Sequence, residues 1–160
     1  MKERPFNFKL LVFFIVLVFV LLGGIGSYFT SMSTGSDWYK SVQPSITPPN
    51  WVFPIAWNFL FATIAFSLYF VWIYSKSKKQ KKKIAIFFGI NFILNMLWSA
   101  LFFGLHLVKL AFFELALLWI SILAIMLIVK KISKESFWLL IPYLIWIAFA
   151  GVINYLAAFH

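Results

Sequence analysis

The sequence has no cysteine, two histidines and only four acidic residues among its 160 positions. The lack of cysteine excludes disulfides, thiolate chemistry and cysteine-ligated metals. His106 and His160 are too few for a zinc site built from protein side chains, so we expect no metal site and no resident cofactor. The sequence also has no carboxylate pair within an apolar stretch, no catalytic histidine pattern and no glycine-rich phosphate loop. A familiar acid–base or nucleophilic centre is therefore not expected.

Charge is scarce in general. Only 11% of the residues are charged and 64% are hydrophobic, whereas an average globular domain has about 25% charged residues. A soluble domain of this size needs more polar groups to cover its surface, so the chain must lie in the lipid bilayer. The net charge of +10 could suggest a nucleic-acid partner. The basic residues stand in short runs between apolar stretches, however, and we expect no nucleic-acid binding.

Five apolar stretches are long enough to cross a hydrocarbon core of about 30 Å, which takes about 20 helical residues. Their approximate limits are 10–29, 51–75, 84–105, 110–129 and 136–159, and Glu114 is the one charged residue within them. The first stretch is too long for a signal-peptide core and lacks a clear cleavage site, so we expect a retained helix. The sequence therefore predicts an all-α integral membrane protein, with residues 1–160 forming a single domain, a five-transmembrane-helix bundle.

The distribution of basic residues predicts the orientation of this bundle. Twelve of the 14 lysine and arginine residues lie in the N-terminal segment and in the second and fourth connectors. Lys40 and Lys109 are the two in the first and third connectors. The positive-inside rule then places the N-terminus inside and the C-terminus outside. The lysine run at 76–83 also fits contact with lipid headgroups, but we favour a topology signal in a short solvated loop.

The connector at 30–50 is unusually long. It contains Trp38, Tyr39 and three prolines, namely Pro44, Pro48 and Pro49. Loops of this length without regular structure are usually lids or binding loops, and prolines stiffen the chain. We expect an ordered lid in which the two aromatic residues are buried. Anchoring of the same aromatic pair at the membrane interface is an equally good interpretation of the composition.

Tryptophan and asparagine side chains gather in the outer half of three predicted spans. The third span carries on one helical face the residues Asn91, Asn95 and Trp98. The fifth span carries the stripe Tyr143, Trp146, Ala150 and Asn154. The second span contributes Trp51 and Trp57, with Asn58 one heptad after Trp51. Flat apolar pockets with a few polar groups are typical of small-molecule sites. The alternative is that these side chains only pack helices together, as membrane asparagines often do.

Three further features concern single helices. The small residues Gly23 and Ser27 are four apart and permit close helix approach, within the fold or between protomers. Pro142 lies inside the fifth span and is expected to kink it. Glu114 lies about one turn from the outer end of the fourth span, from which we expect it to reach headgroups or loop residues.

Three stretches carry recognisable motifs. The first comprises Trp38–Tyr39, the run PSITPPNWVF at 44–53, and Trp57. The second comprises Leu94–Asn95, Trp98 and the run FFG at 102–104. The third comprises the run LLIPY at 139–143, Trp146, Phe149–Ala150 and Asn154–Tyr155. In this order, the motifs resemble those of the translocator protein family, TspO, also called the peripheral benzodiazepine receptor or tryptophan-rich sensory protein.

The resemblance implies a five-helix membrane protein, often a homodimer, with a ligand cavity below the first connector. Members of the family bind porphyrins such as protoporphyrin IX and other flat hydrophobic ligands. The positions that match its cavity motifs are Trp51, Phe53, Asn95, Trp98, Trp146 and Ala150. From the helix faces we add Trp57, Asn91 and Tyr143 as ligand-binding candidates. The family often has glutamine where this chain has Asn91, and its sterol pattern is not completed after Tyr155, so cholesterol is not the expected ligand.

Three functions stay open at this point. The first is binding of a porphyrin or similar flat amphipathic ligand, for sensing, sequestration or transport, in a prokaryotic plasma membrane. The second, which we favour less, is a light-dependent porphyrin-degrading activity that uses Trp51 and Trp146. The third is a structural membrane module without a ligand.

Overall fold

The computed structural model describes residues 6–159, so Lys2, Arg4 and His160 lie outside the described residues. The elements are α1 (Phe8–Val18), the π-helical η1 (Phe19–Ile25), α2 (Gly26–Ser33), α3 (Asp37–Val42), α4 (Val52–Tyr74), α5 (Lys78–Ser99), the π-helical η2 (Ala100–Gly104), α6 (Val108–Val129), α7 (Lys134–Leu139) and α8 (Ile141–Phe159). Consecutive elements join into membrane-spanning helices at Phe8–Ser33, Val52–Tyr74, Lys78–Gly104, Val108–Val129 and Lys134–Phe159. The predicted five-span, all-helical fold is therefore confirmed.

Two helix limits differ from the predicted ones by four residues or more. The first span continues to Ser33, four residues beyond the expected end. The third begins at Lys78 rather than residue 84, because Ser77 caps it and accepts a hydrogen bond from the Gln80 amide at 3.2 Å. The expectation of a solvated loop at 76–83 is therefore wrong for most of these residues, which belong to α5. Lysine is a good helix former, and Lys81 extends over the Trp72 ring with 5.3 Å to the centroid, so its charge can reach the membrane surface.

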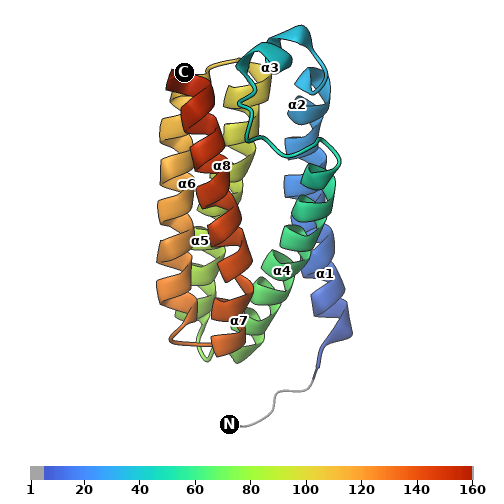
Figure 1. The fold of residues 1–160 in the computed structure, drawn as a ribbon. Helices are drawn as coiled ribbons and strands as arrows, with labels where there is room; N and C mark the ends of the chain where they lie inside the picture. Colours follow the sequence, from blue (N-terminus) through green and yellow to red (C-terminus); the bar gives the residue numbers. More distant parts are fainter. Residues whose placement is uncertain (1–5, 160) are drawn as a thin grey trace.

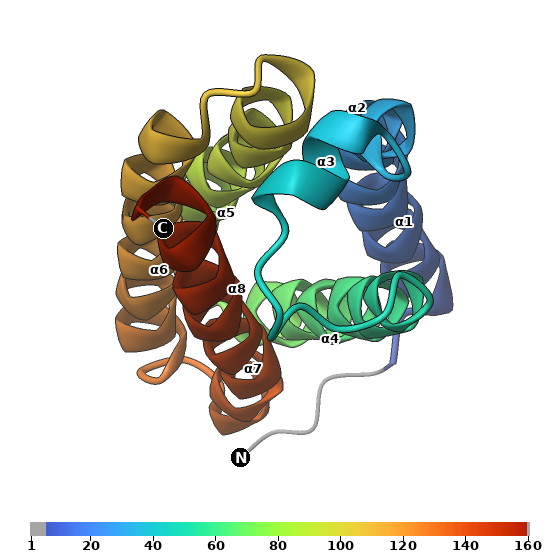
Figure 2. The same ribbon diagram turned by 45° about the horizontal axis from the view of Figure 1, so that its top comes forward.

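The helices form a closed ring (Figures 1 and 2). α1 packs against α4, α4 against α7 and α8, α8 against α6, α6 against α5, and α5 against η1 and α2. The core between them is built from aliphatic and aromatic side chains of all five spans. Figure 2 shows α3 lying across one end of this ring, between α2 and α8.

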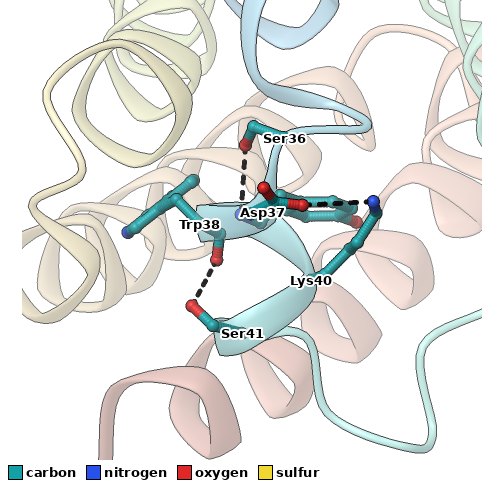
Figure 3. Close-up of polar contacts among 6 residues, drawn as sticks. Ser36, Asp37, Trp38, Lys40 and Ser41 are labelled. Atoms are coloured by element: carbon teal, nitrogen blue, oxygen red, sulfur yellow. Dashed lines mark hydrogen bonds and ion pairs between the residues drawn. The ribbon is translucent and has the colours of Figure 1, made fainter.

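The first connector is not irregular throughout, because six of its residues form α3. Gly35 has a φ of +107°, which lets the chain turn between α2 and α3. Ser36 caps α3 by accepting a hydrogen bond from the Tyr39 amide at 3.1 Å, as Figure 3 shows. The Asp37 carboxylate pairs with Lys40 at 3.3 Å on the exposed side of the helix. A helix this short leaves no periodic signal in the sequence.

Ring contacts hold α3 on the C-terminal end of the third span. The Trp38 indole stacks on the His106 imidazole, with 3.7 Å between centroids and 16° between planes. Tyr39 packs against Phe103 at 5.7 Å. Ser33, at the end of α2, donates a hydrogen bond to the Phe103 carbonyl at 2.6 Å. The first connector is thus an ordered cover with one buried aromatic residue, Tyr39.

The fifth span breaks where proline predicted a distortion. α7 ends at Leu139 and α8 starts at Ile141, so Pro142 stands in the first turn of α8, where its missing N–H costs little. Ser136 of α7 and Ser67 of α4 exchange hydrogen bonds between hydroxyl and carbonyl, at 2.8 and 3.0 Å. These buried bonds tie the two spans together near the end opposite α3.

The orientation can be tested directly, because the chain has no cysteine. The start of α1 and the α4–α5 and α6–α7 connections lie at one end of the bundle, opposite α3 (Figure 1). We expect a membrane-impermeant maleimide to label Lys40→Cys in intact cells and Lys79→Cys only after permeabilisation. The parent chain is the blank. The reverse labelling pattern would show that the lysine-rich end faces outward.

Candidate ligand cavity

A cavity of about 350 Å³ lies inside the ring below α3. Its wall comes from the first span, α4, α5 and α8, and its roof from the first connector. No charged side chain is among the residues that line it. Its size falls in the range of about 300–1,000 Å³ typical of small-molecule sites. Seven predicted residues line it, namely Tyr39, Phe53, Trp57, Asn95, Trp98, Trp146 and Ala150.

One wall is aromatic and joins α4 to α8. The Trp146 ring meets Phe53 at 6.0 Å and Trp57 at 6.5 Å between centroids, both edge to face. Trp57 in turn packs against Phe61 at 5.5 Å. Ala150 lies one turn above Trp146 on α8, where its small side chain leaves the ring faces accessible. This wall offers stacking surfaces to a flat molecule.

The α5 side of the cavity carries a polar side chain, Asn95, and hydrogen bonds to residues outside the cavity fix its orientation. Asn95 donates from Nδ2 to the Tyr143 hydroxyl at 3.0 Å, and that hydroxyl donates to Asn91 Oδ1 at 3.3 Å. Asn91 donates from Nδ2 to Ser121 Oγ on α6 at 2.8 Å. The chain of bonds links α5, α8 and α6. It uses the Asn95 amide nitrogen and leaves Asn95 Oδ1 without a partner among residues 6–159, so this oxygen can accept a hydrogen bond from a ligand.

Trp98 is held in the same way. Its Nε1 donates to Asn154 Oδ1 at 3.0 Å, and Asn154 Nδ2 donates to the Val108 carbonyl at 2.9 Å. The indole also stacks with Phe102 at 5.5 Å. Asn154 is thus a positioning residue for Trp98, and not a residue of the main cavity wall.

The roof contributes Tyr39. Its side chain is buried, and burial raises the pKa of the phenol above its ordinary value. The phenol therefore stays protonated at physiological pH. Its hydroxyl can donate to an acceptor on a ligand below.

Three predicted ligand-binding residues do not line the cavity. Trp51 is the N-cap residue of α4 and is 67% exposed, so its side chain lies largely outside the bundle. Asn91 and Tyr143 are fully buried between helices and orient Asn95. Trp38 stacks on His106 outside the wall. Of the two tryptophans expected for photo-oxidation, only Trp146 reaches the cavity.

The first span supplies wall residues that the prediction missed, namely Leu22, Gly23, Gly26, Ser27, Thr30 and Thr34. The spacing of Gly23 and Ser27 was interpreted as a helix-packing signal. Gly23 does pack closely, since a Cβ there would lie 3.3 Å from the Phe61 ring. The same small residues also leave space beside the wall, which a packing motif in the sequence does not reveal.

Glu114 differs from its prediction. Its side chain is 5% exposed within the bundle, rather than at headgroups or loops. Neither carboxyl oxygen has a hydrogen-bond partner among the described residues, and Glu114 does not line the cavity.

A five-span helical bundle with an aromatic cavity between its helices defines a multi-pass membrane protein with a candidate small-molecule site. The model of the TspO/MBR family matches residues 14–159, and the chain belongs to this family. The resemblance found in the sequence motifs is thereby confirmed.

The chain is similar to proteins from three domains of life. It is 36% identical over 136 residues to the tryptophan-rich protein TspO of Chlorobaculum tepidum, covering 84% of this chain and 85% of that protein. It is 36% identical over 141 residues to the tryptophan-rich protein TspO of Archaeoglobus fulgidus, covering 88% and 90%. It is 32% identical over 143 residues to the translocator protein of Bos taurus, covering 86% and 84%. The bacterial and archaeal relatives support a prokaryotic membrane location.

The role of the bonds behind Asn95 can be measured with Tyr143→Phe. This change leaves Asn91 Oδ1 and Asn95 Nδ2 without their partner, and we expect a loss of about 1–3 kcal/mol in the free energy of unfolding. Reversible unfolding in mixed micelles measures it. Tyr28→Phe is the matched control, since Tyr28 is exposed on α2. Equal stability of the two variants would show that the buried network contributes nothing.

Proposed function

We propose that this protein binds flat amphipathic molecules of the tetrapyrrole class in the cavity below α3, with protoporphyrin IX as the representative ligand. The observation that carries the proposal is the pairing of an aromatic wall with an oriented, unbonded amide oxygen. Trp57 and Trp146 offer ring faces and edges on one side, and Asn95 offers an acceptor on the other.

The energetics favour a large planar ligand. Each aromatic contact contributes about 0.5–1.5 kcal/mol beyond the burial of apolar surface, and Phe53, Trp57, Trp98 and Trp146 all line the cavity. The pyrrole N–H groups or polar substituents of a tetrapyrrole can meet Asn95 Oδ1 and the Tyr39 hydroxyl. Because both groups are positioned before a ligand arrives, little side-chain entropy is lost on binding.

The composition of the wall favours binding over acid–base catalysis. The lining residues are apolar, aromatic, hydroxyl or amide side chains, and none of these is an ordinary general acid or base at neutral pH. Sensing, sequestration and transport all begin with such a binding step. As part of the proposal we also expect a homodimer in the bilayer.

The proposal is tested by titrating the purified protein with protoporphyrin IX in the dark and following the intrinsic tryptophan fluorescence. We expect saturable quenching in the parent chain. Trp146→Phe removes a stacking surface and should weaken binding about two- to tenfold. Ala150→Leu fills space beside Trp146 and should weaken it by about tenfold or more. The dissociation constants of the variants are compared rather than their quenching amplitudes, because Trp146→Phe removes one of the fluorescent tryptophans.

Matched controls lie on the same span. Trp138→Phe changes an exposed tryptophan of α7, and Ala148→Leu changes an exposed alanine of α8; neither residue lines the cavity. Both should bind as the parent does. Linear quenching that ignores Trp146→Phe and Ala150→Leu would indicate partition into detergent, and porphyrin would then be abandoned as the ligand.

A further inference from the structure

We propose that the cavity opens sideways into the bilayer between α2 and the first two turns of α4, and that ligands enter from the lipid through this opening. The inference rests on the proposed function and narrows it to ligands that dissolve in the membrane. We call the opening the α2–α4 portal and define it by Ser27 and Thr30 on α2 and by Pro54 and Asn58 on α4.

The exposure of the lining residues is asymmetric. On α5 and α8, every residue that lines the cavity is buried or half-buried. On the other side, Ser27, Pro54 and Asn58 line the same cavity and are exposed, as are Thr34 and Asn50 of the first connector at the upper end of the same rim. A residue that both lines a cavity and is exposed on the outer surface stands at its rim. The opening therefore faces the seam between α2 and α4.

This seam lacks the contacts that close the others. α4 packs against α1 and η1 of the first span, whereas α2 packs mainly against η2 and α5, so α2 and α4 diverge above η1. The last ring contact between the first span and α4 joins Phe19 of η1 to Phe61 at 5.5 Å. Above it, the hydroxyls of Ser27 and Thr30 and the amide of Asn58 donate to carbonyls of their own helices. Within the described chain, no hydrogen bond or ring contact crosses the seam there.

Ring contacts cross the neighbouring routes. Edge-to-face contacts of Trp146 with Phe53 and Trp57 seal the seam between α4 and α8. At the outer end, the stack of Trp38 on His106 and the contact of Tyr39 with Phe103 hold α3 in place across the ring (Figure 2). A ligand that displaced α3 would have to break these contacts, whereas no hydrogen bond or ring contact among the described residues crosses the α2–α4 portal.

The portal lies at the depth of the lipid chains. Ser27 stands six residues before the end of α2, and Asn58 stands six residues after the start of α4. At 1.5 Å per residue, both lie about 9 Å below the helix ends. Large apolar side chains next to them, Tyr28 on α2 and Phe59 on α4, are about 60% exposed, as lipid-facing residues are. The portal therefore connects the cavity with lipid rather than with water.

The chemistry of the rim suits a flat molecule with a polar edge. Small side chains on α2 allow passage of a thin ring without displacing the backbone. Asn58 bonds the Pro54 carbonyl through Nδ2 at 2.8 Å, which leaves its Oδ1 available as an acceptor at the rim. Such an acceptor offsets part of the cost of moving a polar substituent through hydrocarbon.

The test uses the absence of native cysteine. Ser27→Cys, placed in proteoliposomes, is modified with benzyl methanethiosulfonate. Ile25→Cys is the matched control, since Ile25 is exposed about half a turn away on the same span and does not line the cavity. Protoporphyrin IX is supplied in vesicles, and the rates of quenching and of its reversal are followed in the dark. Reductant then removes the benzyl group from the same sample, so each variant serves as its own reference.

A portal controls passage in both directions. We expect the benzyl group at position 27 to slow association and dissociation by about tenfold each, with the dissociation constant changed less than about twofold. Reductant should restore both rates, and modification at position 25 should change neither. Unchanged rates at position 27 would overturn the portal. Weaker binding at an unchanged association rate would also overturn it, since Ser27 would then act only as a wall residue.

A second measurement separates the portal from the proposed function. A bimane label on Ser27→Cys should be quenched by phospholipids that carry a nitroxide on the acyl chain, because the portal contacts lipid. Lack of quenching overturns the portal even where porphyrin binds. Lack of saturable porphyrin binding to the parent chain removes the proposed function, and with it the role of the portal in porphyrin uptake.

Discussion

The structure depends on one constraint, the cost in free energy of leaving a polar side chain without a partner inside a membrane. Asn91, Asn95, Tyr143 and Ser121 meet this constraint together, in a single chain of hydrogen bonds across α5, α8 and α6. Trp98, Asn154 and the Val108 carbonyl form a second chain between the same three spans. These bonds join three helices into a unit and turn one amide oxygen and one indole toward the cavity.

The rest of the bundle is arranged around this unit. The first span and α4 pack together at the end opposite α3 and separate above η1, and the cavity occupies the space that they leave next to α5 and α8. α3 is held on the unit through Trp38 and His106. One side of the cavity is thus fixed by hydrogen bonds and ring stacking, whereas the other is bounded by small residues without cross-contacts. The function we propose uses the fixed side for recognition and the open side for access.

The sequence predicted the number of spans, because hydrophobic length is a local property that one window of residues displays. It also predicted that Trp57, Asn95, Trp98 and Trp146 line one site, since tryptophan and asparagine are unusual on a membrane helix and their spacing shows which face they share. It failed where direction depends on a neighbour. Trp51 lies just before the start of α4. Asn91 and Tyr143 are buried between helices, where they hydrogen-bond to each other. The wall role of Gly26 and Ser27 had no signal apart from small size.

By itself, the sequence therefore determined that the chain lies in a lipid bilayer, how many helices cross it and which family it belongs to. Apolar length, charge distribution and short motifs are all properties of consecutive residues. Only the tertiary structure decided which polar atoms are already bonded and which are free, because a hydrogen-bond partner from a distant helix leaves no mark near the residue that it satisfies. It also decided where the cavity opens, since an opening is the absence of contact between two helices and no residue encodes it alone.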